Sequence, residues 1–346
     1  MSFPFVQPYF GLGNSLQTAQ AGGAGGIGGW VELARTTLGS AGDTISVASL
    51  PDKRYYMVIA DILATGTSPS TKYRFNNDTG SNYASRWIEN DSGEQTETSQ
   101  SYGTTTTDSA KSNIGVAYIS NLAGQEKLAV SRGTDYGGGI PNRFDSVFKW
   151  VNTSNAINRI DLYNPSSGSF NTGSSCVVLG WDPTDTHTTN FWEELDSSNG
   201  DGSGGWSSGT FAAKTYLWVQ AWVEPSTSAR LDMTFNSDSG GNYTRRQSEN
   251  GGSASTGSSQ SAMLDVIPAS TVAGYVNFFI INRSSTAKLC VSHAMNGGAS
   301  GAGSAPVRIE SAFKWENTSA QITSIDMIPS AGNYSSTSIM KVWGSD

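Results

Sequence analysis

Two runs of the chain carry oxygen-bearing side chains at alternate positions, with the pattern Phe-Asn-x-Asp-x-Gly-x-Asn-Tyr at 75–83 and again at 235–243. Alternating oxygen ligands are typical of calcium loops, which also need a bidentate glutamate at position 12. That position holds Trp87 in one run and Gln247 in the other. The weak metal-ligand candidates are Asn76, Asp78, Asn236 and Asp238.

A tight turn accounts for the same residues without a metal. Asn, Asp and Gly accept left-handed backbone conformations, and Asn and Asp side chains bond to nearby backbone groups. The aromatic residues at either end would then belong to strands that enter and leave the turn. We predict a turn here, and no metal or other cofactor.

The turn motif belongs to a longer internal duplication. Phe148-Lys149-Trp150 returns as Phe313-Lys314-Trp315, and the run 127–131 returns as 288–292, in the same order and at a nearly constant offset. The period is far longer than the roughly 20–50 residues of solenoid repeats. Each copy is therefore a full domain. We predict an arm at 1–29, one domain at 30–181, a linker at 182–190 and a second domain at 191–346.

Alternation with period two dominates both copies. Phe144, Ser146, Phe148 and Trp150 share one face of an extended segment, and 309–315 repeats the pattern. One apolar face at this period indicates a half-buried strand. No segment keeps a helical period. About eight strands per copy predict an all-β protein with two tandem jelly-roll-like antiparallel β-sandwich domains and an extended N-terminal arm.

Catalytic groups are sparse. The two histidines, His187 in the linker and His293 in the second copy, have no equivalent histidine in the other copy. A histidine base needs a third group that orients it, and neither residue has an evident one. Glu193 and Glu194 are adjacent, so in an extended chain they point to opposite faces and cannot flank a glycosidic bond. We predict that the protein is not an enzyme.

Composition excludes several classes of partner. Charged residues are 14%, the net charge is −8 and the Lys and Arg residues do not cluster, which argues against nucleic acid and against a membrane surface. No stretch approaches the ~20 apolar residues of a membrane span, and the N-terminus lacks the features of a signal peptide. Cys176 and Cys290 occupy non-equivalent places, which indicates small buried residues rather than a disulfide.

The N-terminal arm combines an apolar first half with an Ala- and Gly-rich tether. Its apolar side chains are candidates for partner binding, either on another protein or on the arm's own domain as an extra strand. These candidates are Phe3, Phe5, Tyr9, Phe10 and Leu12. Four further tryptophans are candidates for an exposed sugar-stacking surface: Trp87, Trp206, Trp218 and Trp222.

The opening Ser2-Phe3-Pro4-Phe5, the run Pro8-Tyr9-Phe10-Gly11-Leu12, the Gly-rich tether and the duplicated Phe-Lys-Trp-x-Asn-Thr-Ser strand resemble structural proteins of marine viruses and tailed phages. This resemblance implies a non-enzymatic virion component, made in the host cytoplasm and located in the particle. Its role would be capsid decoration through the arm, or a place in the tail. The partners implied are the major capsid protein or other virion proteins, with self-association and host-surface glycans as further options.

A second class of function stays open. A duplicated β-sandwich whose surface is rich in Ser, Thr and Asn also suits a carbohydrate-binding adhesin or receptor-binding module. Two similar domains would then give double-valent binding with a gain in avidity.

Overall fold

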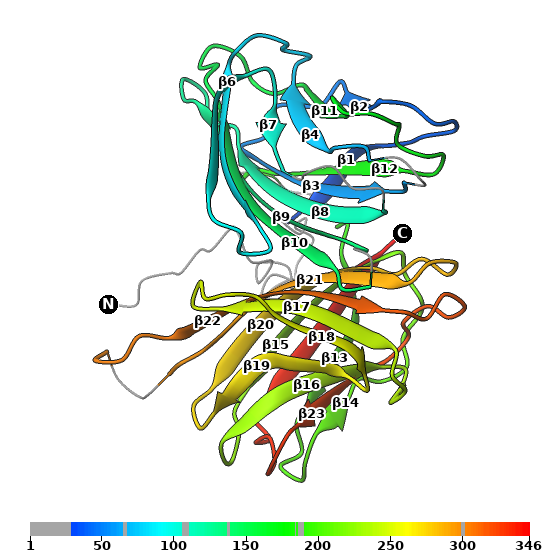
Figure 1. The fold of residues 1–346 in the computed structure, drawn as a ribbon, viewed down its shortest axis with the longest axis vertical. Helices are drawn as coiled ribbons and strands as arrows, with labels where there is room; N and C mark the ends of the chain where they lie inside the picture. Colours follow the sequence, from blue (N-terminus) through cyan, green and yellow to red (C-terminus); the bar gives the residue numbers. More distant parts are fainter. Residues whose placement is uncertain are drawn as a thin grey trace. The chain divides into compact units, whose positions relative to one another are not determined.

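The computed structural model describes residues 29–64, 68–105, 111–136, 139–183, 185, 190–298 and 302–346. All regular elements in this part of the chain are β-strands, which confirms the all-β prediction (Figure 1). By its internal contacts the chain divides into two compact units. The first comprises 29–88, 94–133 and 144–192, and the second comprises 193–346 with the short segments 89–93 and 134–143.

The strands fall into two sets with the same order along the chain. The first repeat holds β1 (Val31–Thr37), β2 (Thr44–Ala48), β3 (Tyr55–Ile62), β4 (Lys72–Phe75), β5 (Tyr83–Glu89), β6 (Gln95–Gln100), β7 (Gly103–Thr104), β8 (Asn113–Ser120), β9 (Lys127–Asp135), β10 (Asn142–Trp150), β11 (Arg159–Tyr163) and β12 (Ser175–Trp181).

The second repeat holds β13 (Glu193–Asn199), β14 (Trp206–Ser207), β15 (Tyr216–Val223), β16 (Ala229–Phe235), β17 (Tyr243–Glu249), β18 (Ser255–Gln260), β19 (Met263–Ser270), β20 (Gly274–Ile281), β21 (Lys288–Asn296), β22 (Val307–Trp315), β23 (Ile325–Pro329) and β24 (Ile339–Ser345).

Each repeat is a sandwich of a large and a small sheet. The large sheet of the first repeat has the order β1-β12-β3-β8-β9-β10-β5-β6, and the small sheet has the order β2-β11-β4-β7. The second repeat reproduces both orders as β13-β24-β15-β20-β21-β22-β17-β18 and β14-β23-β16-β19. The printed pairings are antiparallel, as in β3 with β8 and β15 with β20. The prediction of two antiparallel β-sandwiches is therefore confirmed.

The core of each sandwich lies between its two sheets. In the first repeat Tyr56, Val58 and Ala60 alternate along β3 toward the small sheet, where Ile160 and Leu162 of β11 meet them. The second repeat does the same with Leu217, Val219 and Ala221 of β15. We call the side of a large sheet that faces the small sheet its inner face, and the other side its outer face.

The expectation of about eight strands per repeat was too low, since each repeat has twelve among the described residues. Among the additional strands, β6 and β7 show no apolar alternation. β6 has the sequence Gln-Thr-Glu-Thr-Ser-Gln, and β7 has only two residues. β6 is a largely exposed edge strand with polar side chains on both faces, so it leaves no periodic apolar signal, and β7 is too short to show one.

Two predictions about special segments can be compared with the fold. Cys176 and Cys290 are free and fully buried, as expected of small core residues, and burial raises the pKa of both thiols. In the described residues no helix has the length and hydrophobicity of a membrane span.

Candidate functional site

The run at 75–83 forms a turn, as predicted. Asn76 and Asn77 have φ of 53° and 54°, and the amide of Asp78 donates to the carbonyl of Phe75 over 2.9 Å. Positive φ at both central residues is what a type I′ turn between antiparallel strands requires. Asn236 and Ser237 repeat the geometry with φ of 53° and 54°.

The carboxylate of Asp78 is occupied by three internal donors. Its Oδ1 accepts from the amide of Gly80 at 2.8 Å, and its Oδ2 accepts from Asn82 Nδ2 at 2.9 Å and from the indole Nε1 of Trp150 at 2.6 Å. Asp238 has the same three donors in Gly240, Asn242 and Trp315. In the described residues no group of three or more His, Cys, Asp or Glu side chains is arranged to hold a metal ion.

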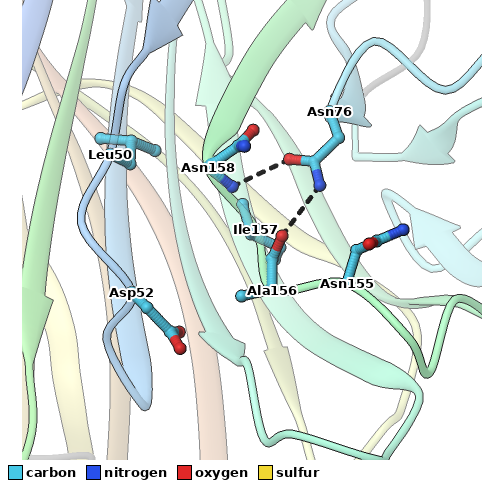
Figure 2. Close-up of a pocket in the computed structure, with 7 residues that line it drawn as sticks. All are labelled: Leu50, Asp52, Asn76, Asn155, Ala156, Ile157 and Asn158. Atoms are coloured by element: carbon cyan, nitrogen blue, oxygen red, sulfur yellow. Dashed lines mark hydrogen bonds between the residues drawn. The ribbon is translucent and has the colours of Figure 1, made fainter.

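Asn76 lines a pocket of about 460 Å³ in the first repeat, between the segment after β10 and the β2–β3 connection. Figure 2 shows its side chain turned toward the 156–158 backbone. Its Oδ1 accepts from the amide of Asn158 and its Nδ2 donates to the carbonyl of Ala156, both at 2.8 Å. Asp52 lies on the other side of the pocket and accepts from Asn121 Nδ2 at 2.9 Å.

This pocket is polar and lacks a ring on which a ligand could stack. Its lining consists of Leu50, Asp52, Asn76, Asn155, Ala156, Ile157 and Asn158. Asn236 makes the same contacts in the second repeat, to Thr323 and Gln321. The asparagine therefore tethers the turn to the next segment of chain in both repeats, which makes its role structural.

Features shared by both repeats are thus scaffold, and surface features present in only one are better candidates for function. The outer face of β24, β15, β20 and β21 carries such a feature. Register places Ile339, Trp222, Tyr275 and Met295 side by side across these four strands. Trp222 is 38% exposed and Met295 is 41% exposed. We call these four residues the aromatic row.

A polar row lies beside it, two residues along each strand. Lys341, Gln220 and Asn277 are paired across β24, β15 and β20. Gln220 Nε2 donates to Asn277 Oδ1 at 3.3 Å, and that oxygen also accepts from the indole of Trp218 at 2.5 Å. Lys341 Nζ lies 3.0 Å from both carboxylate oxygens of Glu194. We call these three residues the polar row.

The hydroxyl oxygen of Tyr275 is buried, so this residue contributes its ring to the aromatic row. Burial raises the pKa of Tyr275 to about 12, so its phenol stays protonated at neutral pH. The face therefore combines flat apolar rings with amide and ammonium groups about 7 Å away along the strands.

The first repeat has no such row. Its register aligns Ser175, Asp61 and Ile114 where the second repeat has Ile339, Trp222 and Tyr275. Asp61 is 3% exposed and Ile114 is 1% exposed. The difference is visible in the sequence once the repeats are aligned, because a tryptophan replaces an aspartate. Its meaning depends on the register, which brings together residues more than a hundred positions apart.

The other predicted site residues differ in location and in exposure. Trp206 and Trp218 are buried and Trp87 is half-buried, so Trp222 alone of the four predicted tryptophans is exposed. His293 lies on β21, and Glu193 and Glu194 on β13 form ion pairs with Lys214 and Lys341. His187 and the arm residues Phe3, Phe5, Tyr9, Phe10 and Leu12 lie outside the described residues.

No family model matches this chain, and no curated protein is similar to it. Among solved structures it is similar to domains LG4–5 of the mouse laminin α1 chain, with 11% identity, a TM-score of 0.20, and coverage of 91% of this chain and 89% of that one. It is also similar to the LG1–3 region of the laminin α2 chain, with 8% identity, a TM-score of 0.21, and coverage of 87% of this chain and 64% of that one. A third similar structure is Ail, the attachment invasion locus protein of Yersinia pestis, with 6% identity, a TM-score of 0.13, and coverage of 80% of this chain and 99% of that one.

Proposed function

We propose that the protein is a non-enzymatic binding protein of the adhesin type, and that it binds carbohydrate through the second repeat. The observation that carries this proposal is the aromatic row with the polar row beside it. Indole and phenol rings offer flat apolar surfaces to the apolar face of a sugar ring. Gln220 is buried, but the half-buried Asn277 and Lys341 can meet the hydroxyl groups of the sugar, because an amide both donates and accepts and an ammonium donates.

The arrangement favours an extended ligand over a small enclosed one. The aromatic row runs across four strands, which places its ends about 14 Å apart at the usual strand spacing. Trp222 and Met295 are exposed, whereas Trp218, Phe279 and Trp343 on the same outer face are buried, so the row marks one exposed end of that face. We therefore infer that the ligand is an oligosaccharide chain lying across the strands, held by several weak contacts.

Trp222 is the residue to change first. Wild-type protein should bind a subset of oligosaccharides on a glycan array, and Trp222→Ala should weaken binding to those glycans at least tenfold in calorimetry. Trp181→Ala is the matched control, because Trp181 is a half-buried tryptophan of the first repeat that stacks on Tyr55 at 5.5 Å. Equal binding by wild type and Trp222→Ala, or no glycan binding at all, would reject the proposal.

A virion role is a second candidate, favoured by the sequence of residues 1–29 and its resemblance to virion proteins. Under this proposal the arm attaches the protein to a particle and the two sandwiches face outward, as a capsid decoration protein or a tail component. Density-gradient particles from the source culture, quantified by mass spectrometry against the major coat protein, test it directly. Absence of this chain from the particle fractions would remove the virion role and leave the glycan proposal untouched.

A further inference from the structure

The first repeat has an apolar depression of about 510 Å³ on the outer face of β5, β6, β9 and β10. Leu128 and Val130 of β9 and Val147 of β10 form its centre, with exposed fractions of 55%, 46% and 46%. Their chain neighbours Ala129 and Phe148 belong to the core, so the three side chains point away from it. Adjacent exposed aliphatic residues on a sheet face mark a docking surface.

The charged side chains that line or border this depression already have partners, and Glu97 among them accepts a hydrogen bond from Thr104 Oγ1. Arg86 forms an ion pair with Glu94, and Lys149 Nζ lies 2.9 Å from Glu126. A charged ligand would have to compete with these partners. The surface therefore suits an uncharged apolar segment, which could cover the aliphatic centre without breaking either pair.

The described chain begins beside this depression. The ring of Trp30 lies 6.3 Å from that of Tyr118 on β8. Tyr118 points to the outer face, because its neighbours Ala117 and Ile119 belong to the core. In the second repeat the equivalent residues of Tyr118 and Val130, Phe279 and Val291, are directly paired. The chain thus arrives at β1 over the outer face, one strand away from β9.

The segment that precedes Trp30 is uncharged and partly apolar, which is the kind of segment that suits this surface. Residues 1–31 contain no Asp, Glu, Lys, Arg or His, and the apolar side chains gather within residues 3–12. Residues 13–29 can span up to ~55 Å when extended, whereas β10 is two strands from β8, or ~10 Å. The entropic cost of closing a flexible loop rises only slowly with its length, so a linker of this length costs little more than a shorter one.

We propose that residues 3–12 of the same chain dock in the depression formed by Leu128, Val130 and Val147. The segment covers the aliphatic centre of the first repeat, and its aromatic side chains fill the depression. This proposal is independent of glycan binding by the second repeat. It also means that the segment is already occupied in the isolated protein, so a particle would have to displace it in order to use it as an anchor.

Disulfide trapping in the full chain tests the proposal. The two native cysteines are fully buried, so only the introduced thiols should form a disulfide under mild oxidation. Phe10→Cys combined with Val147→Cys should form an intrachain disulfide under mild oxidation, detected as a linked peptide pair by mass spectrometry of the monomer. Phe10→Cys combined with Ile328→Cys is the control, because Ile328 is an aliphatic residue of the second repeat that is 37% exposed.

Three results would decide the matter. Trapping with Val147→Cys at least tenfold above the control, reduced when Val130→Asp is added, supports docking in the same chain. A disulfide that appears only in dimers would overturn it in favour of a second copy as the occupant. Equal trapping in test and control pairs would overturn it altogether.

Discussion

The indole of Trp150 donates a 2.6 Å hydrogen bond to Asp78, and Trp315 donates to Asp238 at 2.7 Å, so the bond that links the last residue of a strand to the type I′ turn occurs in both repeats. The rings around it are duplicated as well. Phe75 and Trp150 lie 5.8 Å apart at 68°, and Phe235 and Trp315 lie 5.7 Å apart at 65°. This conserved geometry assigns the motif to the scaffold.

Removing the acceptor should destabilise each repeat separately. Asp78→Ala leaves three donors without their acceptor, and a hydrogen bond to a charged group contributes about 1.5–3 kcal/mol. We expect a loss of about 2–4 kcal/mol in the free energy of unfolding of the first repeat, measured by urea denaturation. Asp238→Ala should affect the second repeat equally, and the double variant should show additive losses. An effect below about 0.5 kcal/mol would contradict the structural role of this carboxylate.

The same carboxylates predict sensitivity to acid. Burial raises the pKa of Asp78, but the bonds from Trp150, Asn82 and Gly80 outweigh it, and the net pKa is lowered. A carboxyl group whose pKa is lowered in the folded state stabilises the fold above its unfolded pKa, and this stability is lost as the pH falls through the folded pKa. Below about pH 4 the wild type should therefore lose more stability than Asp78→Asn, as thermal unfolding between pH 6 and pH 2 would show.

Lys288 predicts a second rise in stability with pH, at alkaline pH. It is fully buried, its Nζ donates to the carbonyls of Thr286 and Asn317 at 2.8 and 2.9 Å, and burial lowers its pKa from 10.5 to about 8. Between these pH values the unfolded chain keeps the proton that the folded chain has lost. The free energy of unfolding should therefore rise with pH there, by at most about 1.4 kcal/mol per pH unit.

Urea denaturation at pH 7, 8, 9 and 10 measures this contribution as the difference between wild type and Lys288→Met. Lys341→Met is the control, because Lys341 is only half-buried and pairs with Glu194. A difference between wild type and Lys288→Met that stays constant from pH 7 to pH 10 would show that the lysine remains protonated in the fold.

Gly103 tests the packing of the first sandwich. A Cβ atom at this position on β7 would lie 2.2 Å from Cδ2 of Phe148, a buried core residue. Gly103→Ala should therefore cost about 1–3 kcal/mol through overpacking. Gly39→Ala is the matched control, since nothing lies within 4 Å of its Cβ. Calorimetry should show a lower unfolding temperature for Gly103→Ala alone, and equal temperatures for the two variants would contradict this packing.

Metal addition should leave stability unchanged. Both oxygens of Asp78 and of Asp238 accept internal hydrogen bonds, and a calcium ion would have to displace those donors. Millimolar calcium or a chelator should shift the unfolding temperature by less than about 1 °C. A larger rise in the unfolding temperature with calcium would support a calcium site at the turns. Its ligands would then be the turn residues Asn76, Asp78, Asn236 and Asp238.

The sequence allowed the scaffold to be predicted better than the surface. The matched motifs required two copies of one fold, and alternation along 144–150 and 309–315 predicted strands that the structure has as β10 and β22. β6 and β18 were missed because they contain only Gln, Thr, Ser, Glu and Gly, so neither strand has an apolar face. Trp222 was one of four equal candidates, since spacing along one strand does not show which neighbouring strands bring Tyr275 and Ile339 beside it.

The equal strand orders of the two repeats have a consequence for biogenesis. A nascent chain with two interchangeable sets of strands risks pairing a strand of one set with a partner from the other, which is a characteristic failure of repeat proteins. Two features oppose this outcome. The first twelve strands are complete at Trp181, before any strand of the second set has been translated. The outermost strands β6 and β18 carry polar side chains, so an exchanged pairing there would bury almost no apolar surface.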